Sequence, residues 1–275
     1  MICSKNTLEL GEHPSARYGN VCYYLRMKLD AITIVDINTL PWRATANAGL
    51  WLKPVREDAE LGEFLGLVRF DPDVRSGLHQ HQGVATSFVI DGGLTDYHGS
   101  IALHEAGINT RGSTHDAIAY QRTILVSRLE GRVSYPPKSE ISGIHSGSYS
   151  ESFVNPDPDR SPEINIKVDA LATQETGISG VRRQTIFDYA GTGSNHRMLQ
   201  WHIRPGTQFK FTAGALTEFW VRGGNLEIND QAAHANCFIC IPAGTPVQVS
   251  SPFGALLLGW ANGPAENTPA SLLGF

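Results

Sequence analysis

Two histidines stand one residue apart in the stretch "SGLHQHQGVATSFVIDGG", residues 76–93. The alternation of apolar and polar residues after them predicts that His79 and His81 head a β-hairpin. Side chains at positions i and i+2 of a strand project to the same face, so both imidazoles can reach one metal ion at about 2.0–2.1 Å. The spacing indicates part of a metal site, because two ligands alone do not complete one.

A third ligand has to come from farther along the chain. The donors that follow the pair are Asp91, Asp96, His98, His104, Glu105 and His115. His115 follows the turn-like "RGST" and opens the segment "HDAIAY", which is typical of another strand. An antiparallel neighbour would carry this imidazole to the other two, so we expect His115 to be the third ligand. Neutral imidazoles suit Fe, Zn, Cu or Ni alike, and the ligand type therefore does not choose the metal.

Short apolar or alternating segments dominate the rest of the chain, and helical periodicity is scarce. Examples are "FLGLVRF", "TILVSRLEGRVSY", "TEFWVRGGNLEI" and "GALLLGWA", each bounded by turn residues. This rhythm predicts an all-β sandwich or barrel. Residues 136–162 break it with "PPKSEISGIHSGSYSESFVNPDPDRSP", which is typical of a linker or a long surface excursion.

An internal repeat relates the two sides of that stretch. The segment "HQHQGVATSFVIDGG" aligns without gaps on "KFTAGALTEFWVRGG", with matching glycines, threonines and phenylalanines. Lys210 and Thr212 then fall at the positions of the two histidines, and Val247 falls at the position of the third. Glu218 is the one carboxylate that remains near the expected metal position. The second copy is therefore predicted to be a metal-free structural half that packs on the first or forms a dimer surface.

The repeat sets the expected domain boundaries. We assign residues 1–38 to an N-terminal extension, 39–137 to a metal-binding domain, 138–165 to a linker and 166–275 to a degenerate domain without metal. Each copy spans about 100 residues, the ordinary size of one β-barrel domain.

The histidine strand, a later glycine and the "G-x-x-H" that ends at His115 resemble the two sequence motifs of the cupin superfamily. Trp42 and the segments "LWLKPV", "LVRFDPD" and "ILVSRLEGRVSY" more narrowly resemble the ChrR-like cupins, a group that includes small dioxygenases. The resemblance implies two tandem jelly-roll β-barrels, the second degenerate. It also implies that His79, His81 and His115 are metal ligands.

The glutamate of the first cupin motif is missing here. Ala85 and Thr86 stand four and five residues after the second histidine, where most cupins place it. In one dioxygenase type the carboxylate lies later, in a G-x-W-x-Y-x-E pattern, and the corresponding "GGLTDYH" has His98 at the glutamate position. The resemblance thus makes His98 a fourth ligand, with Asp96 or His104 as substitutes.

The resemblance implies an Fe(II)-dependent dioxygenase that cleaves a C–C bond in a small diketone or hydroxy-ketone with dioxygen. No catalytic residue beyond the ligands is identified, although Glu105 and Asp116 lie near the site in sequence, and Zn, Ni, Cu or Mn remain alternatives to iron. A non-catalytic metal- or ligand-binding sensor and a Zn-dependent hydrolase, isomerase or lyase stay open. By strand alternation, the predicted cavity wall consists of Phe70, Phe88, Ile90 and Ile124.

Composition removes several other partners. The 22 Lys and Arg residues are outnumbered by 27 Asp and Glu residues, so no basic footprint for nucleic acid or an anionic membrane is present. The apolar runs fall short of the ~20 residues of a membrane span, and the N-terminus lacks a signal-peptide pattern, which favours a cytoplasmic location. Cys237 and Cys240 form a CxxC within a predicted strand, where they point to opposite faces, so we interpret them as buried apolar residues.

Overall fold

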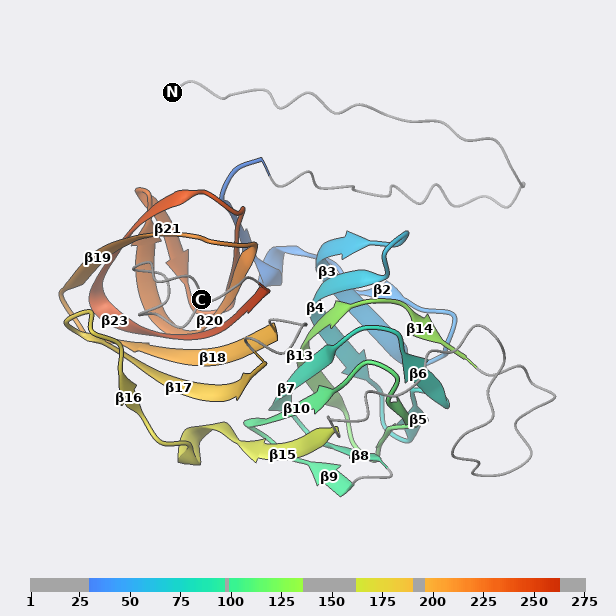
Figure 1. Cartoon of the computed structure of the whole chain (residues 1–275). Coiled ribbons are helices and arrows are strands. Elements are labelled where there is room, and N and C mark those ends of the chain that lie inside the picture. Colours follow the sequence, from blue (N-terminus) through green and yellow to red (C-terminus); the bar gives the residue numbers. More distant parts are fainter. Residues whose placement is uncertain (1–29, 97–98, 136–161, 190–195, 263–275) are drawn as a thin grey trace, which may run out of the picture.

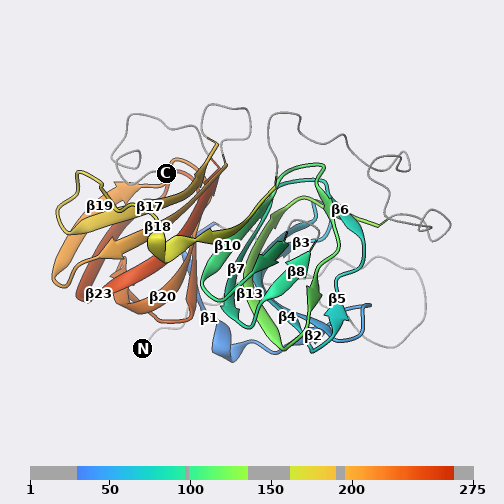
Figure 2. The same ribbon diagram turned by 90° about the horizontal axis from the view of Figure 1, so that it is seen from below.

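A computed structural model describes residues 30–96, 99–135, 162–189 and 196–262 of the 275-residue chain. Within these ranges the chain forms β-strands, the two short 3-10 helices η1 (Ile37–Thr39) and η3 (Val168–Ala170), and no α-helix. The predicted all-β class is therefore confirmed. The strands form two barrel-like units that lie side by side (Figures 1 and 2).

The N-terminal barrel is built on a seven-stranded sheet and two smaller sheets. In spatial order, the large sheet contains β15 (Glu163–Lys167), β10 (Glu105–Asn109), β7 (Ala85–Asp91), β13 (Thr123–Glu130), β4 (Glu63–Phe70), β3 (Leu50–Asp58) and β2 (Arg43–Ala44). The smaller sheets are β11 (Thr114–His115), β6 (His79–His81) and β14 (Val133–Ser134), and β5 (Val74–Arg75), β12 (Ile118–Ala119), β8 (Leu94–Asp96) and β9 (Gly99–Ile101).

The C-terminal barrel is a nine-stranded sheet. Its main path runs β1 (Thr33–Asp36), β22 (Cys237–Ile241), β20 (Thr217–Ile228), β23 (Pro246–Asn262), β18 (His196–Ile203), β17 (Val181–Asp188) and β16 (Gln174–Glu175). Off this path, β19 (Thr207–Thr212) pairs with β23, and β21 (Gln231–His234) pairs with β20.

Each barrel receives one strand from the chain that leads into the other. Strand β1 precedes the N-terminal barrel but pairs with β22, where Ile34 lies opposite Ile239. Strand β15 precedes the C-terminal barrel but pairs with β10, where Ala106 lies opposite Ile166. The segment assigned to the extension, residues 1–38, thus contains a strand of the C-terminal sheet, and the segment assigned to the linker, residues 138–165, contains the start of β15.

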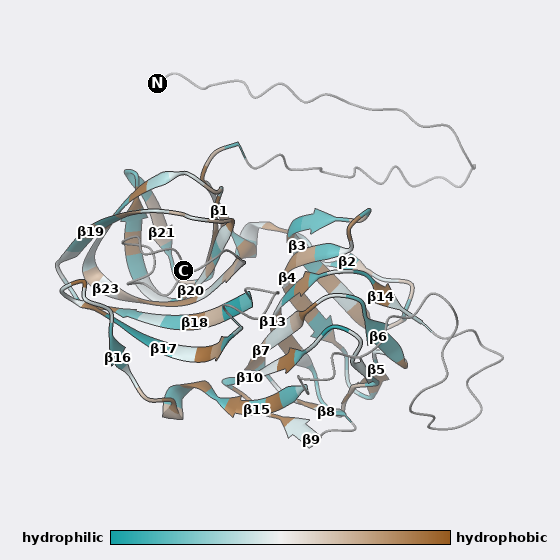
Figure 3. Ribbon diagram, in the orientation of Figure 1, coloured by the Kyte–Doolittle hydropathy of each residue, from teal (hydrophilic) through white to brown (hydrophobic). Residues whose placement is uncertain are grey.

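The barrels pack on each other through one face of each large sheet. Phe88 of β7 and Val126 of β13 belong to the same buried cluster as Trp220 of β20 and Leu258 of β23. Apolar residues, brown in Figure 3, accordingly occur on strands of both barrels. Because side chains alternate along a strand, the intervening residues of these strands point the other way, into the interior of their own barrel.

The two barrel interiors differ. The C-terminal interior is filled by a cluster of buried apolar side chains that includes Trp201, Phe209, Phe211 and Phe219. Cys237 belongs to this cluster, whereas Cys240 belongs to the cluster between the barrels. The two cysteines therefore lie on opposite faces of β22, as their spacing predicts.

Candidate metal centre

Three histidines meet at one end of the N-terminal barrel. Strands β6 and β11 are antiparallel neighbours, and His79 lies directly opposite His115. One ligand nitrogen from each of His79, His81 and His115 lies within 4.8 Å of the others. The sequence-based expectation that an antiparallel strand carries the third histidine to the first two is thus met.

The spacing of these nitrogens suits a single ion. The Nε2 atoms of His81 and His115 are 3.0 Å apart. Two nitrogens that bind one ion at about 2.1 Å and at right angles are also about 3 Å apart. The residues present therefore fit a metal ion without rearrangement of these two rings.

All three histidines are buried, and each is at most 9% exposed. Burial, together with the neighbouring His115, lowers the pKa of His79 to about 4, and burial with the two neighbouring rings places the pKa of His81 well below its usual range. The imidazoles of His79 and His81 accordingly keep free nitrogen lone pairs at neutral pH, which is the form that binds a metal.

Two of the rings are held in a fixed orientation. His79 Nδ1 donates a hydrogen bond to the carbonyl oxygen of Gly77 at 2.6 Å. His115 Nδ1 donates to Asp96 Oδ2 at 3.1 Å. Each bond fixes the tautomer that leaves Nε2 free, as is usual for metal-binding histidines. Sequence reasoning identified Asp96 as a substitute ligand, but the structure places its carboxylate behind His115 as a positioning group.

The other predicted donors have different places. His98 lies outside the described residues. His104 is remote from the cluster, because its ring stacks on Phe88 at 6.1 Å between centroids. Glu105 accepts a hydrogen bond from the backbone N–H of Ala102, and Asp116 pairs with Arg75, the last residue of β5.

No carboxylate replaces the missing cupin glutamate within the described part of β7. Ala85 faces the cavity, whereas Thr86 points to the interface between the barrels, where its hydroxyl accepts a hydrogen bond from Trp260 Nε1 at 3.0 Å. Asn109 on β10 lies opposite Ala85 and also lines the cavity. Its Oδ1 is buried and accepts no hydrogen bond within the described part of the chain. An amide oxygen is thus left available close to the position of the missing carboxylate.

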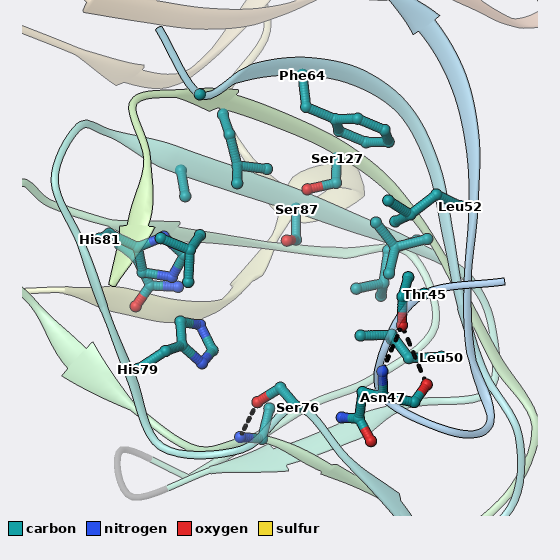
Figure 4. Close-up of a pocket in the computed structure, with 18 of the residues that line it drawn as sticks. Thr45, Asn47, Leu50, Leu52, Phe64, Ser76, His79, His81, Ser87 and Ser127 are labelled. Carbon is teal, nitrogen blue, oxygen red and sulfur yellow. Dashed lines mark hydrogen bonds between the residues drawn. The ribbon is translucent and has the colours of Figure 1, made fainter. Parts of the chain in front are cut away.

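The histidines open into a cavity of about 780 Å³. His79 and His81 lie at one end, and Leu52 and Phe64 lie across the cavity from them (Figure 4). The apolar wall includes Leu50, Leu52, Phe64, Val68, Phe70, Leu125 and Leu129, and the polar wall includes Thr45, Asn47, Ser87, Asn109 and Ser127. Among the described residues that line the cavity, none is Lys or Arg.

The predicted wall is correct for Phe70 and wrong for the other three residues. Phe88 belongs to the cluster between the barrels, and Ile90 and Ile124 pack against that cluster. The cavity is lined instead by their sequence neighbours, including Ser87 and Leu125. Both faces of β7 and β13 are buried, so alternation alone does not tell which face is the cavity.

The pairing of strands also corrects the alignment of the two repeats. In the N-terminal barrel His79 pairs with His115, and in the C-terminal barrel Phe211 pairs with Val247. In the same way, the N-terminal pair Ala85–Asn109 corresponds to the C-terminal pair Thr217–Ile241. The N-terminal pair Ser87–Ser127 corresponds to the C-terminal pair Phe219–Gly259. At all six positions, the residue of the C-terminal barrel follows its counterpart in the N-terminal barrel by the same number of residues. This number is one larger than in the gap-free sequence alignment.

A shift of one residue moves each side chain to the other face of a strand. Lys210 and Thr212, predicted at the histidine positions, are therefore exposed on the outside of β19. Phe211 and Ala213 stand there instead, and Val247 stands opposite Phe211 at the predicted position of the third histidine. All three belong to the C-terminal core, and none of these side chains can bind a metal.

Glu218 corresponds to Thr86 in this register and is not a remnant of a metal site. Its carboxylate is fully buried between the barrels, where Arg56 Nε and Arg128 Nε each donate to it at 2.5 Å. Burial raises its pKa, but the two arginines outweigh burial and hold the pKa of Glu218 below its usual range. It therefore joins the two domains as an ion-paired anion.

Residues 30–133 match the family model described as "ChrR Cupin-like domain". No curated protein matches the chain. Among solved structures, a proposed dioxygenase from Nostoc punctiforme is similar, with a TM-score of 0.67, 12% identity and coverage of 84% of this chain and 82% of that chain. Oxalate decarboxylase from Bacillus subtilis is also similar, with a TM-score of 0.56, 13% identity and coverage of 84% and 76%. These likenesses show that the chain has the cupin fold.

Proposed function

We propose that the N-terminal barrel binds one divalent transition metal through His79, His81 and His115. The observation that carries this proposal is the convergence of three buried imidazoles at the end of a cavity, two of them oriented by a hydrogen bond on the opposite nitrogen. His98 remains proposed as a fourth ligand. Three protein ligands leave coordination positions that face the cavity and can accept a substrate.

We further propose that the barrel is a dioxygenase that uses Fe(II) and dioxygen to cleave a C–C bond in a small diketone or hydroxy-ketone. Bound iron would supply the electrons that activate dioxygen. The chain itself contributes three uncharged ligands, which leave the charge of the ion uncompensated and so favour a substrate bound as an enolate. Asp96 holds the imidazole ring of His115 in a fixed orientation. The apolar wall that includes Leu52 and Phe70 limits the access of water to the metal site.

The fold neighbours support this proposal only in outline. One of them is a proposed dioxygenase and another a decarboxylase, so the same fold is found with oxygenase and C–C bond chemistry. The match to the ChrR cupin-like family favours a second candidate, a barrel that binds a metal or ligand without turnover. A zinc-dependent hydrolase or isomerase on the same ligands is a third.

Metal analysis separates the metal site from the reaction. We expect protein purified without added metal to contain about one transition-metal ion per chain. His115→Ala should lose this metal, and His98→Ala should weaken its binding. His104→Ala is the matched control, because its imidazole is half-exposed, stacks on Phe88 and should leave the metal content unchanged. Full metal content in His115→Ala would show that the ligand set is wrong.

Oxygen uptake then tests the reaction. Iron-loaded protein should consume dioxygen with a member of a panel of β-dicarbonyl and hydroxyacetophenone compounds, and His115→Ala should not. An absence of uptake with iron fully loaded would reject the dioxygenase and favour the ligand-binding candidate.

Location and assembly remain predictions. None of the helices in the described ranges is long and apolar enough to cross a membrane. A cytoplasmic location and a homodimer are retained as proposals that gel filtration and fractionation can test.

A further inference from the structure

We infer that the cavity receives an uncharged, mainly apolar substrate whose metal-binding oxygen atoms meet the histidines and whose body extends across the barrel towards Leu52 and Phe64. This inference rests on the proposed metal site and goes beyond it by stating the size, polarity and charge of the substrate. It predicts that a substrate with a negative charge away from its metal-binding oxygens is bound poorly.

The first argument is size. Cavities of about 300–1,000 Å³ hold drug-sized ligands, and this one measures about 780 Å³. A two-carbon acid bound at the histidines would leave most of that space to water. The end across from the histidines is walled by Leu50, Leu52 and Phe64, which favour an apolar body there (Figure 4).

The second argument is charge. The acidic residues Glu57, Asp58 and Glu63 line the cavity, and no lysine or arginine is found among its described lining residues. The arginines that pair with two of these acids are engaged there, because Arg43 pairs with Glu57 and Arg56 pairs with Glu63 and Glu218. A negative charge on the substrate away from the metal would therefore be taken out of water without a partner, which is strongly unfavourable.

The third argument comes from the other barrel. Ser87 and Ser127 are opposite each other on β7 and β13, and both line the cavity between the histidines and Leu52 (Figure 4). At the position of Ser87 the C-terminal barrel has Phe219, which is buried in a filled interior. The small side chain of Ser87 thus leaves open the space that a phenyl ring occupies in the second copy.

Three probes with the same metal-binding head test the inference. Acetohydroxamate is small, benzohydroxamate adds a phenyl ring, and 4-carboxybenzohydroxamate adds a negative charge to that ring. Zinc-loaded protein prevents redox turnover, and calorimetry measures the dissociation constants after the zinc content has been determined. We expect benzohydroxamate to bind about tenfold or more tightly than acetohydroxamate, because the ring buries apolar surface. The carboxylated probe should bind at least about tenfold more weakly than benzohydroxamate.

Variants locate the binding site of the ring. Ser87→Phe copies the second barrel and should abolish the advantage of benzohydroxamate while acetohydroxamate still binds. Ser127→Leu fills the same space from the neighbouring strand and should act in the same direction if Ser87→Phe does not fold. Ser100→Phe, on the exposed strand β9, is the matched control and should leave all three affinities unchanged. Circular dichroism verifies the fold of each variant.

The outcomes distinguish the inference from the metal site. With zinc bound, equal affinities for the two uncharged probes, or a carboxylated probe that binds as well as benzohydroxamate, would overturn the substrate class but leave the metal site intact. If the wild-type protein bound zinc no more tightly than His115→Ala does, the proposed metal site would be overturned, and the substrate class with it.

Discussion

The ion cluster between the barrels makes a sharp prediction about stability. The cluster consists of Arg56, Glu63, Arg128, Glu130, His196 and Glu218. Glu218 is fully buried, and the side chains of Arg56 and Arg128 are 8% and 2% exposed. The change Glu218→Gln preserves the shape of the side chain but removes the negative charge that both guanidinium groups share.

Removal of one partner from a buried ion pair typically lowers the free energy of unfolding by about 3–5 kcal/mol, because a charge is left buried and uncompensated. Arg56 keeps Glu63, and Arg128 keeps Glu130, so we expect the lower end of that range, about 3 kcal/mol. This is a large share of the ~5–15 kcal/mol that stabilises most domains.

Chemical denaturation measures this loss. Trp220 and Trp260, two of the five tryptophans, lie in the core between the barrels, so part of the tryptophan fluorescence should report the interface, and circular dichroism should report the strands. Two barrels need not unfold together, so both signals have to be followed. Glu57→Gln, which breaks a partly exposed pair with Arg43, is the control and should change stability by at most ~1 kcal/mol. An equally small effect of Glu218→Gln would refute the reasoning.

Three further changes test other parts of the structure. Asp96→Asn should weaken zinc binding by about 10–100-fold without a change in fold, measured by competition with a chelator, and an unchanged affinity would exclude Asp96 as a positioning residue. The metal-free protein should lose stability as pH falls from 6.5 towards 4: His79 has a pKa of about 4 when folded and 6.5 when unfolded, so the unfolded chain binds more protons in this window. His79→Gln should reduce that slope by up to about 1.4 kcal/mol per pH unit in urea titrations, and an identical slope would contradict the shift. Gly66→Ala should strongly destabilise the N-terminal barrel, because a Cβ at this position would clash with the carbonyl oxygen of Lys53. Gly214→Ala is the control and should be tolerated, because a Cβ there meets no atom within 4 Å. Thermal melts measure the difference between the two variants.

The metal cluster could be predicted from sequence because it depends on local rules. The i and i+2 spacing of His79 and His81 fixes their common face, and a turn followed by a short strand brings His115 opposite. The orienting role of Asp96 was not predictable in the same way. A carboxylate close to three histidines is an equally good ligand on paper, and only its position behind His115 assigns it to the second nitrogen.

The choice of face was not predictable from one sequence. A strand with one buried face shows clear alternation, but β7 and β13 are buried on both faces, one against the cavity and the other against the second barrel. Phe88 looks like a cavity residue for this reason, and Ser87 looks like a solvent-facing one. The exchange of β1 and β15 between the barrels was equally hidden. Thr33 pairs with Cys240, and Glu105 pairs with Lys167, and pairing between residues so far apart in the sequence leaves no local signal.

The corrected register shows that the second barrel differs from the first in more than the three histidine positions. Phe211, Ala213 and Val247 replace the histidines, and Phe219 fills the space that Ser87 leaves open in the first barrel. Histidines introduced at these positions alone would therefore meet an interior packed with buried apolar side chains. The face between the barrels is buried in both copies, where Phe88 corresponds to Trp220. The duplication thus keeps the packing surface on one side of each sheet while the other side varies between a filled core and a candidate metal site with its cavity.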